Sequence, residues 1–559
     1  MNSEEKPFLA ETHEVFNQPP PLADINLYDQ DIALREALHR EGGGWAEERV
    51  RDYGALAGSE EMIALGFQAN EFKPVLHTHD RFGHRVDRVD YHPAYHRILG
   101  TAIAHELHAL PWTHPRPGAH VARAALEYLH AQMEAGTGCP LTMTFACIPV
   151  IRQQADVARL WEARITARHY DPGDRPALTK PGLTIGMAMT EKQGGSDVRA
   201  NATRAYPLAN RGAGQAYELV GHKWFCSAPM SDAFLVLART QTGLSCFLLP
   251  RWRPDGQRNA IHIQRLKNKL GNASNASSEV EFRGAYAHLL GEEGQGIATI
   301  MDMVALTRFD CMTGSAGLMR QAVSQVAHHI GHRAAFGKPL IEQALMQNVA
   351  ADLLVESEAA LALAFRVGRA LDRHALEDSE RLFVRLATAV GKYWICKRAP
   401  AHINEAQECL GGAGYVEESL LPRLYREAPV NSIWEGSGNV QCLDVLRTLA
   451  RRPDTFEVLL NELRLAQGAD RRLDAHIAGL QDEWPLTGED GEYRARSIVE
   501  KMALALQGSL LVRAGCAAVA DAFCAARLGG SGGRVYGTLP KGADCRAIIT
   551  RGWPAASPP

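Results

Sequence analysis

Short β-rich runs between about residues 181 and 290, enclosed by long helical stretches, constrain the fold of this chain most strongly. The runs read LTIGMAMTE, AYELVGHKWF, AFLVLART, SCFLLP, AIHIQRL and SEVEFRGA, and Gly, Pro and Asn turns separate them. This pattern predicts an antiparallel sheet or barrel. From Asp31 to about Ala167 apolar residues often recur at three- and four-residue spacing, and the same spacing returns after the β block. Helices are therefore expected on both sides of the sheet.

The chain is too long for one hydrophobic core, so we expect several domains. Helical spacing after the β block covers 297–335, 345–373, 380–409 and about 455–528. The expected domains are an N-terminal arm with a helical domain (1–180), a β domain (181–290), a helical-bundle domain (291–448) and a C-terminal helical domain (449–559). The predicted fold class is mostly α with a central β domain.

Composition is that of an ordinary soluble protein, with 46% hydrophobic and 22% charged residues. The formal net charge of −4 gives no overall attraction to nucleic acid or anionic membranes, so either partner would require a local basic patch. No run of about 18 uncharged apolar residues occurs, and the acidic N-terminus lacks the apolar core of a secretory signal. The 11 cysteines are scattered without a C-x-x-C pair, which favours reduced thiols and a cytoplasmic location.

The segment HTHDRFGHRVDRVDYHPAYH holds a group of histidines, namely His77, His79, His84, His92 and His96. An H-x-H pair with distant partners does not have the ligand spacing of a metal site. We therefore predict no metal and interpret these side chains as packing and hydrogen bonding within the N-terminal helices.

The loop GMAMTEKQGGSDV, residues 186–198, leaves a β run and places hydroxyls at Thr190 and Ser196 around Gly194 and Gly195. Such a loop can offer backbone N–H groups and hydroxyls to a polar ring edge or a phosphate. A β-turn whose Ser and Asp cap their own backbone is the alternative.

Three further motifs could contact a ligand, and each also has a purely structural interpretation. The aromatic pair Trp224 and Phe225 in GHKWFCSAP could lie against a flat cofactor or fill a core. Arg333 in HRAAFGKPL could hold a phosphate, although a helix end followed by Gly and Pro is common. LGGAGY, residues 410–415, could bring backbone amides to a pyrophosphate or simply cap a helix.

A Trp-Glu pair running into Gly-Ser-Gly ends the series, in NSIWEGSGN (431–439). Taken in order, the motifs resemble the acyl-CoA dehydrogenase family of flavoproteins, whose pattern reads T-E-x-x-x-G-S-D, a strand with W, R-x-x-F-G, L-G-G-x-G-Y and Y/W-E-G-[TS]. The likeness covers about residues 60–450. It implies an N-terminal helical domain, a β-barrel or sandwich domain and a C-terminal four-helix bundle, here with an extra C-terminal helical domain.

Several stretches resemble the AidB-like branch of that family, which is linked to the adaptive response to DNA alkylation. They are MTEKQGGSDV, NKLGNASNASSEVEF, PRLYREAPVNSIWEGSGNVQCLDVLR, the Pro-rich N-terminal arm and the residues after Pro453. Ordinary members of the family usually stop near the end of the second helical domain. The extra residues therefore favour the AidB-like branch.

The resemblance implies FAD bound between the β domain and the later helices. Its expected contacts are Met187, Met189, Thr190, Gly195, Ser196, Trp224, Phe225, Ser227, Arg333, Phe336, Gln347, Gly411, Gly412, Ile433, Trp434, Gly436, Ser437 and Asn439. Arg333 and Phe336 would reach the FAD of a neighbouring subunit, which implies a homo-oligomer, a dimer of dimers. Glu408 stands where the family usually has Gln, and a carboxylate there would repel a pyrophosphate unless it faced solvent.

In the resembling enzymes the Glu of the W-E-G loop removes the α-proton of an acyl thioester while a β-hydride passes to flavin N5. Glu435 is the matching residue, and a dry pocket would raise its pKa toward the operating pH. A cap partner near Gly436 is its structural alternative. Some members take the base from an earlier helix, but Thr307 at that place cannot act as a base. Arg308 beside it could orient an acyl carbonyl or carboxylate, and is expected to bind substrate.

The C-terminal stretch is basic. Residues 501–559 carry Lys501, Arg513, Arg527, Arg534, Lys541, Arg546 and Arg551 against two aspartates. Such a surface could bind duplex phosphates, although a few arginines on helices usually form a solvated face. Resemblance to the AidB-like branch, whose C-terminal domain binds double-stranded DNA, favours DNA binding through Arg447, Arg451 and Arg534.

Two main readings follow from these patterns. The first is an FAD-containing protein of the alkylation response that binds double-stranded DNA and retains at most weak acyl-CoA dehydrogenase activity. It would protect DNA or deactivate alkylating agents. The second is a metabolic acyl-CoA dehydrogenase for short or branched chains, whose C-terminal domain serves only assembly. A flavin-stabilised scaffold without turnover is a third.

Overall fold

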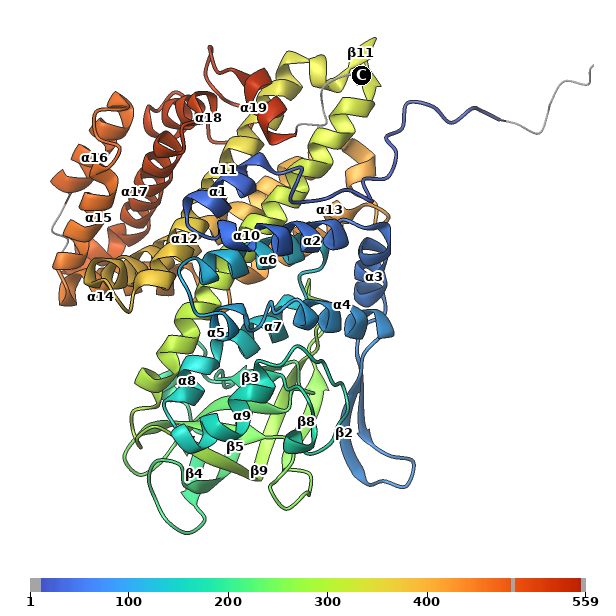
Figure 1. The fold of residues 1–559 in the computed structure, drawn as a ribbon, viewed down its shortest axis with the longest axis vertical. Coiled ribbons are helices and arrows are strands. Elements are labelled where there is room, and N and C mark those ends of the chain that lie inside the picture. The colour runs from blue at the N-terminus through green and yellow to red at the C-terminus, as the bar shows by residue number, and fades with distance from the viewer. Residues whose placement is uncertain (1–11, 484–487, 554–559) are drawn as a thin grey trace, which may run out of the picture.

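The structure, a computed structural model, describes residues 12–483 and 488–553. A closed sheet occupies one end of the molecule, long helices occupy the other, and the last helices pack along the side of the bundle (Figure 1). The expected fold class, mostly α with a central β domain, is confirmed.

Nine helices precede the sheet in the described residues. They are α1 (Ile32–Arg40), α2 (Glu47–Ala57), α3 (Glu60–Glu71), α4 (Pro93–Ala104), α5 (Leu110–Thr113), α6 (Ala119–Met133), α7 (Gly138–Ala146), α8 (Ile148–Arg152) and α9 (Ala155–Ile165). Local signals set their starts: Asp31 accepts a hydrogen bond from the Leu34 N–H at the N-cap of α1, and Ser59 does the same for Met62 in α3. Every residue of α6 is buried, because α2, α10 and α11 pack around it.

The seven-stranded sheet closes on itself. Its strands are β3 (Ile185–Ala188), β4 (Arg204–Pro207), β5 (Ala216–Ser227), β6 (Ala233–Arg239), β7 (Leu244–Pro250), β8 (Ile261–Leu266) and β9 (Ser277–Leu290). The order runs β3-β6-β4-β5-β9-β7, β8 adds to β9, and β7 pairs back with β6. Most pairs are antiparallel as expected, but β3 runs parallel to β6 in the register Ile185 with Ala233.

Five helices form the body beyond the sheet. They are α10 (Gly296–His332), α11 (Ala344–Arg373), α12 (Asp378–Cys409), α13 (Leu420–Asn431) and α14 (Gly438–Arg451). α10, α11 and α12 pack on one another, and α13 and α14 pack on α12. α10 is buried on nearly all faces between these helices, α6 and α7, as expected for a central helix.

The C-terminal helices lie against α11, α12 and α14. They are α15 (Asp454–Arg464), α16 (Arg471–Asp482), α17 (Gly488–Ala514), α18 (Ala517–Phe523) and α19 (Cys545–Gly552). α19 returns to the body and packs on α11 and α1 (Figure 1). The Gly-rich stretch GGSGGRVYG, residues 529–537, therefore leads into a docked helix that no helical spacing predicted.

One segment of the N-terminal region was expected to be helical and is not. β1 (Val75–His79) and β2 (Arg85–Asp90) form an antiparallel hairpin that extends beside β8 (Figure 1). The β-branched residues Val75, Thr78, Val86 and Val89 favour strands, and the turn at Gly83, with φ of 87°, joins them. The histidines there pair in the hairpin rather than in helices: His77 contacts Asp90 at 3.1 Å, and His84 contacts Asp80 at 3.0 Å.

A short hairpin follows α10. Ala334–Ala335 (β10) pairs with Lys338–Pro339 (β11), and both turn residues, Phe336 and Gly337, have positive φ. α10 thus ends at His332, three residues before the expected end. No helix within the described residues is long and apolar enough to cross a membrane.

Candidate active site

Glu435 lies in the short loop between α13 and α14, in a left-handed backbone conformation with φ of 58°. Gly436 follows with φ of 97°. A non-glycine residue in this region costs on the order of 1 kcal/mol or more, so it persists only where neighbours hold it. The sharp turn aims the Glu435 side chain back toward α10.

Three side chains hold the loop by its carbonyl groups. Lys392 of α12, which is 1% exposed, donates to Trp434 O at 2.7 Å and to Gly436 O at 2.6 Å. Gln441 of α14 donates to the carbonyls of Glu435 and Gly436, and Arg308 Nε donates to Glu435 O at 2.9 Å. This network fixes the backbone on both sides of the carboxylate.

The carboxyl group contacts α10 through a hydroxyl. Thr307 Oγ1 donates to Glu435 Oε2 at 2.7 Å and also lies 3.0 Å from Val304 O. When Glu435 is ionised, the Thr307 hydroxyl donates its hydrogen bond to the carboxylate. When Glu435 is protonated, its own proton can go to Thr307, whose hydroxyl then donates to Val304 O. The arrangement accommodates both protonation states without moving a heavy atom.

Burial raises the pKa of the Glu435 carboxyl. The hydrogen bond from Thr307 and the charges of Lys392 and Arg308 oppose this rise, and the net shift is upward. A carboxylate in this setting is a stronger base than one in water. It is therefore suited to take a proton from a weak carbon acid near neutral pH.

Arg308 is engaged inside the protein. Besides Glu435 O, its Nη1 donates to Asp444 at 2.9 Å, and Arg385 also donates to Asp444. The 8% exposed Arg308 residue thus supports the loop. Its expected contact with an acyl group stays a prediction.

The loop after β3 is anchored by a buried ion pair that no sequence motif predicted. Lys223 donates to Glu191 at 2.8 Å, and neither side chain is exposed. Burial raises the pKa of Glu191, but Lys223 and hydrogen bonds from Thr203 and Ala202 outweigh it and lower that pKa to about 2. Burial lowers the pKa of Lys223 to about 8, against the effect of Glu191. Glu191 therefore fixes the loop that carries Thr190.

The expected contacts on this loop run from the core to the surface: Met187 belongs to the core, and Ser196 is exposed. The Thr190 carbonyl accepts from the Trp224 N–H at 2.8 Å, which joins the loop to β5. Across residues 12–483 and 488–553, the hydroxyls of Thr190 and Ser196 make no hydrogen bond. A Cβ at Gly195 would lie 3.2 Å from Thr190 Cγ2. Met187 is 9% exposed, and Met189 is half-buried.

The aromatic pair on β5 presents one ring to solvent. Phe225 is 46% exposed, and Trp224 is half-buried with Lys267 Nζ 3.2 Å from its ring centroid. Neither ring belongs to the cluster of core side chains beneath the sheet. The core-packing alternative for this pair therefore does not hold for Phe225.

Cys139 of α7 connects the β domain to Glu435. Burial raises the pKa of its thiol to about 11; Lys269 and hydrogen bonds with Asn275 and Ser227 lower it, while the Glu435 charge raises it. Ser227 also shares a 2.9 Å hydrogen bond with Ser277. Ser227 and Glu435 thus both act on the pKa of the half-buried Cys139 thiol.

The other expected contacts on the loop of Glu435 lie around it. Ile433 is 64% exposed, while Trp434 and Ser437 are half-buried. Trp434 Nε1 donates to Asn431, and Arg496 Nε donates to Asn439 at 2.8 Å. Gly411 and Gly412 form an open turn, where a Cβ would meet no atom within 4 Å. Glu408 is exposed, so it can face solvent as a neighbouring pyrophosphate would require.

Arg333, Phe336 and Gln347 do not join the Glu435 site of the same chain. Arg333 lies 25 residues beyond Arg308, about 38 Å along a helix at 1.5 Å per residue. Its Nη1 donates to Asn17 O at 2.7 Å, so the N-terminal arm fastens this hairpin. Phe336 is 98% exposed, and Gln347 donates to Ile341 O.

Several of the expected contact residues have features that fit a flat dinucleotide cofactor. Unpaired hydroxyls, a small-residue loop, a half-exposed Phe225 and an open Gly-Gly turn are features that a flavin and its diphosphate use. No group of three His, Cys, Asp or Glu side chains placed to hold a metal ion occurs in the described residues.

Most C-terminal cations that suggested a basic surface are bound in ion pairs. Lys501 pairs with Glu483, Arg513 with Glu462, Arg527 with Asp352 and Glu356, and Arg551 with Glu36 and Glu358. Such pairs fasten the C-terminal helices to the body and neutralise charge. Arg447, Arg451 and Arg534 remain exposed, and within the described ranges their side chains have no ion-pair partner.

Sequence comparisons match family models along most of the chain. Residues 17–172 match the adaptive response protein AidB N-terminal domain, 186–285 the acyl-CoA dehydrogenase middle domain, and 294–450 the acyl-CoA dehydrogenase C-terminal domain. The chain is 47% identical to AidB of Escherichia coli strain K12 over 94% of this chain and 96% of that one. It is 31% identical to acyl-CoA dehydrogenase family member 11 of Caenorhabditis elegans, over 70% of this chain and 65% of that protein.

Solved structures agree with these matches. The apo form of Bd2924 aligns with a TM-score of 0.82 and 28% identity, covering 90% of this chain and all of that one. A Caenorhabditis elegans acyl-CoA dehydrogenase in complex with C11-CoA aligns with a TM-score of 0.82 and 26% identity, over 97% of this chain and 93% of that one. On its sequence, its domain models and its fold, the chain belongs to the AidB-like branch of the acyl-CoA dehydrogenase family.

Proposed function

We propose that this protein binds FAD and uses Glu435 as the base in acyl-CoA dehydrogenase-type chemistry. The observation that carries the proposal is the Glu435 carboxyl, held in a strained loop by Lys392, Gln441 and Arg308 and hydrogen-bonded to Thr307. If Glu435 served only as a helix-cap partner, its loop would not need these hydrogen bonds. A solved family structure from Bacillus anthracis with 16% identity is complexed with FAD.

The loop around Thr190 and Ser196, the Trp224–Ser227 segment and the Ile433–Asn439 segment would hold the cofactor. FAD, when bound there, would accept a hydride from the β-carbon of the acyl group. Glu435 would take the α-proton on Oε1 or Oε2. Thr307 then exchanges its donor role for an acceptor role, so the new carboxylic acid keeps its hydrogen bond.

Flavin reduction tests this chemistry. Oxidised, FAD-loaded protein mixed anaerobically with acyl-CoA thioesters of several chain lengths should lose flavin absorbance, and Glu435→Gln should abolish the loss while keeping bound FAD. Reduction that survives Glu435→Gln would refute the role of Glu435 as base. Protein that purifies colourless and does not take up FAD would refute the cofactor.

The proposal includes a homo-oligomer, a dimer of dimers. Arg333 and Phe336 of one copy would complete the FAD site of another, because they lie just beyond the end of α10 that is far from their own Glu435. Phe336→Asp should reduce the assembled mass measured by light scattering and weaken FAD affinity together. An unchanged mass with weakened FAD would contradict the link.

Binding of double-stranded DNA is a second proposed function, in the alkylation response. Arg447 and Arg451 lie one turn apart on α14 and are both exposed, and Arg534 adds a third free cation. Exposed cations displace counterions from DNA phosphates, so binding should weaken as salt rises. In this reading acyl-CoA turnover is weak, and the flavin protects DNA or deactivates an alkylating molecule.

The ion pairs of the C-terminal cations favour the rival, a metabolic enzyme for short or branched acyl chains whose last helices serve assembly. A duplex titration at rising salt separates the two. The combined change Arg447→Ala, Arg451→Ala and Arg534→Ala should weaken binding and flatten its salt dependence. Arg464→Ala, a change at an exposed arginine paired with Glu457, is the control. If duplex DNA does not bind, or if its binding does not depend on salt, the DNA-binding proposal is refuted and the metabolic enzyme remains.

A further inference from the structure

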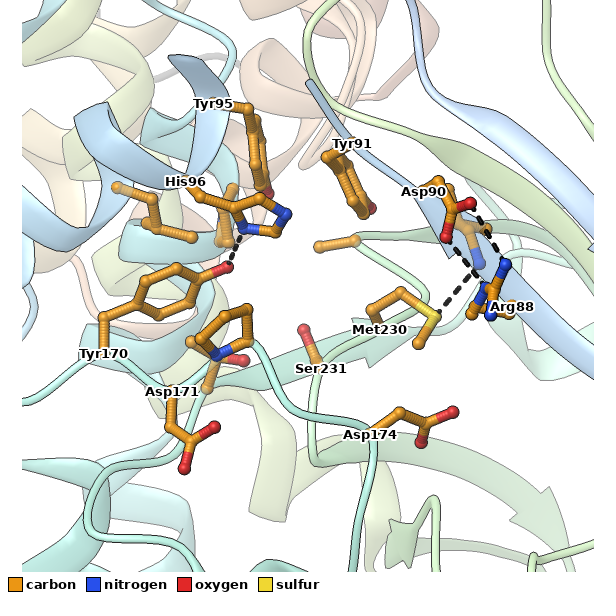
Figure 2. A pocket seen from close by; sticks show the side chains of 16 residues that line it. Arg88, Asp90, Tyr91, Tyr95, His96, Tyr170, Asp171, Asp174, Met230 and Ser231 are labelled. Carbon is orange, nitrogen blue, oxygen red and sulfur yellow. Dashed lines mark hydrogen bonds and ion pairs between the residues drawn. The ribbon is translucent and has the colours of Figure 1, made fainter. Parts of the chain in front are cut away.

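Two features of the N-terminal region are not used by the proposed function. One is a cavity of about 270 Å³ between α4, the β1–β2 hairpin and the turn after β5 (Figure 2). Its wall residues bond to one another, as His96 does with Tyr170, and these bonds identify no occupant. The other is the N-terminal arm, residues 12–31, which contacts the β10–β11 hairpin.

The arm runs antiparallel to the last third of α10. Pro20 O accepts a hydrogen bond from His328 Nε2 at 2.8 Å, and Gln30 O accepts one from Arg320 Nη2 at 2.8 Å. As the residue number rises along the arm, the number of its partner on α10 falls. The first residues of the arm therefore lie at the C-terminal end of α10, where the β10–β11 hairpin begins.

Asn17 clamps this hairpin. Its Nδ2 donates to Ala334 O at 2.9 Å, and its Oδ1 accepts from the Ala334 N–H at 2.7 Å. Its backbone carbonyl accepts from Arg333 Nη1 at 2.7 Å. Asn17 has φ of 56°, a left-handed conformation that Asn adopts more readily than most residues. One residue of the arm thus bonds to two successive residues at the start of the hairpin.

The clamp orients Arg333 without neutralising it. A guanidinium group carries five N–H donors, and Asn17 O takes one of them. Over residues 12–483 and 488–553, the Arg333 side chain has no other hydrogen bond and no ion-pair partner. A guanidinium group that is held in place with free donors suits the phosphates of a ligand.

Large apolar side chains are exposed around the same hairpin. Phe16 is 76% exposed and precedes Asn17, and Phe336 in the turn is 98% exposed. Leu345 is 77% exposed, and the side chain two residues before it donates to a hairpin carbonyl at 2.9 Å. Exposed apolar side chains gathered in one place mark an interface. A second copy is the expected partner, because Phe336 belongs to the proposed FAD site between copies.

We propose that the N-terminal arm is part of the FAD site that two copies share. Asn17 is a positioning residue, which holds Arg333 and Phe336 where they reach the FAD of the second copy, and Phe16 contacts that copy. This role rests on the proposed homo-oligomeric FAD site, to which it adds a segment from the N-terminal region of the chain.

Titration of FAD into full-length protein freed of its cofactor, followed by flavin fluorescence, tests the role of Asn17. Asn17→Gly permits the left-handed backbone but removes both amide bonds to Ala334, and should weaken FAD affinity about fivefold. Asn17→Ala also disfavours the backbone conformation and should weaken it about tenfold. Asn26→Ala is the control, because the Asn26 amide also joins the arm to the body, but at Arg51 O of α2.

A double-mutant cycle separates positioning from a general loss of structure. If Asn17 acts through Arg333, then Asn17→Ala should weaken FAD affinity less in the Arg333→Ala background than in the wild type. Light scattering tests the contact with the second copy. Phe16→Asp should lower the assembled mass, whereas Phe82→Asp, at a phenylalanine 70% exposed in the β1–β2 hairpin, should not.

The outcomes distinguish this role from the proposed function. Wild-type protein that takes up no FAD would refute the cofactor and the role of the arm together. If the wild type binds FAD and both Asn17 variants bind it equally well, the role of Asn17 is refuted and the cofactor stands. Equal effects of Asn17→Ala with and without Arg333 would refute positioning through that arginine. An unchanged mass in Phe16→Asp would refute the contact between the arm and the second copy.

Discussion

The Thr307 hydroxyl donates a 2.7 Å hydrogen bond to Glu435 Oε2 and so joins α10 to the loop between α13 and α14. The bond stabilises the ionised carboxylate and opposes the rise in its pKa that burial causes. A residue that cannot itself be a base thereby tunes the base.

Thr307→Val should raise the pKa of Glu435 further, because it removes a donor to the charged form. The base must be ionised to act, so the pH at which flavin reduction reaches half its maximal rate should move up by about one unit. Stopped-flow reduction across pH 5 to 9 measures this. Thr313→Val on the same helix is the control, since among the described residues the Thr313 hydroxyl bonds only to Phe309 O. Equal midpoints in both variants would contradict the account.

Lys392→Met should release the strained loop. The ammonium group donates to the carbonyls of Trp434 and Gly436, and its loss removes this donor from the half-buried Trp434 carbonyl, while Gly436 O keeps the bond from Gln441. The expected cost is about 1 to 3 kcal/mol in unfolding free energy, with a larger loss of flavin-reduction rate. Lys397→Met, at an exposed lysine one turn further along α12, should change neither. A fully active Lys392→Met protein would show that the loop of Glu435 keeps its conformation without Lys392.

The fold was largely predictable because long helical spacing and β-rich runs are local signals. The bounds of α11 and α12 lie within two residues of the expected helical segments 345–373 and 380–409. The β1–β2 hairpin was missed because its strands are short, polar and placed between helices, and α19 was missed because it follows a Gly-rich stretch. The spacing of apolar residues along the chain therefore does not indicate the β1–β2 hairpin or α19.

The candidate site was predictable only where a motif marked it. Glu435 follows from the W-E-G pattern, but Lys392 and Gln441 act on backbone carbonyls brought near by folding, which leaves no sequence signal. The net charge of residues 501–559 does not indicate which of their cations are paired, for the same reason. Their ion-pair partners, such as Glu36, Asp352 and Glu462, lie far away in the sequence.

The buried pair of Glu191 and Lys223 predicts acid sensitivity. The folded pKa of Glu191, about 2, lies below its ordinary value of 4.5, so its stabilising contribution is full above pH 4.5 and is lost as the pH falls toward 2. Glu191→Gln leaves Lys223 buried and unpaired, and should cost about 3 to 5 kcal/mol at pH 7. Thermal unfolding at several pH values should show a flatter acid dependence in this variant. An unchanged dependence would contradict the pairing.

Arg366 should hold the C-terminal helices to the body. It pairs with Glu380 of α12 and Glu462 of α15, both at 2.9 Å, and Arg513 also reaches Glu462. Arg366→Met leaves two buried carboxylates without their main partner, which should expose α15 to faster hydrogen exchange. Arg381→Met, at an exposed arginine paired with Asp378, is the matched control. Equal exchange in α15 for both variants would refute the anchor.

Solvent exchange of the substrate α-proton tests the role of Glu435 most directly, because it reports proton removal whether or not hydride transfer follows. FAD-loaded protein incubated with an acyl-CoA in D₂O should place deuterium at the α-carbon, as read by mass spectrometry. Glu435→Gln should stop this exchange while still binding the thioester and FAD. Exchange at the wild-type rate in Glu435→Gln would show that another group removes the proton, and the account built on this carboxylate would fail.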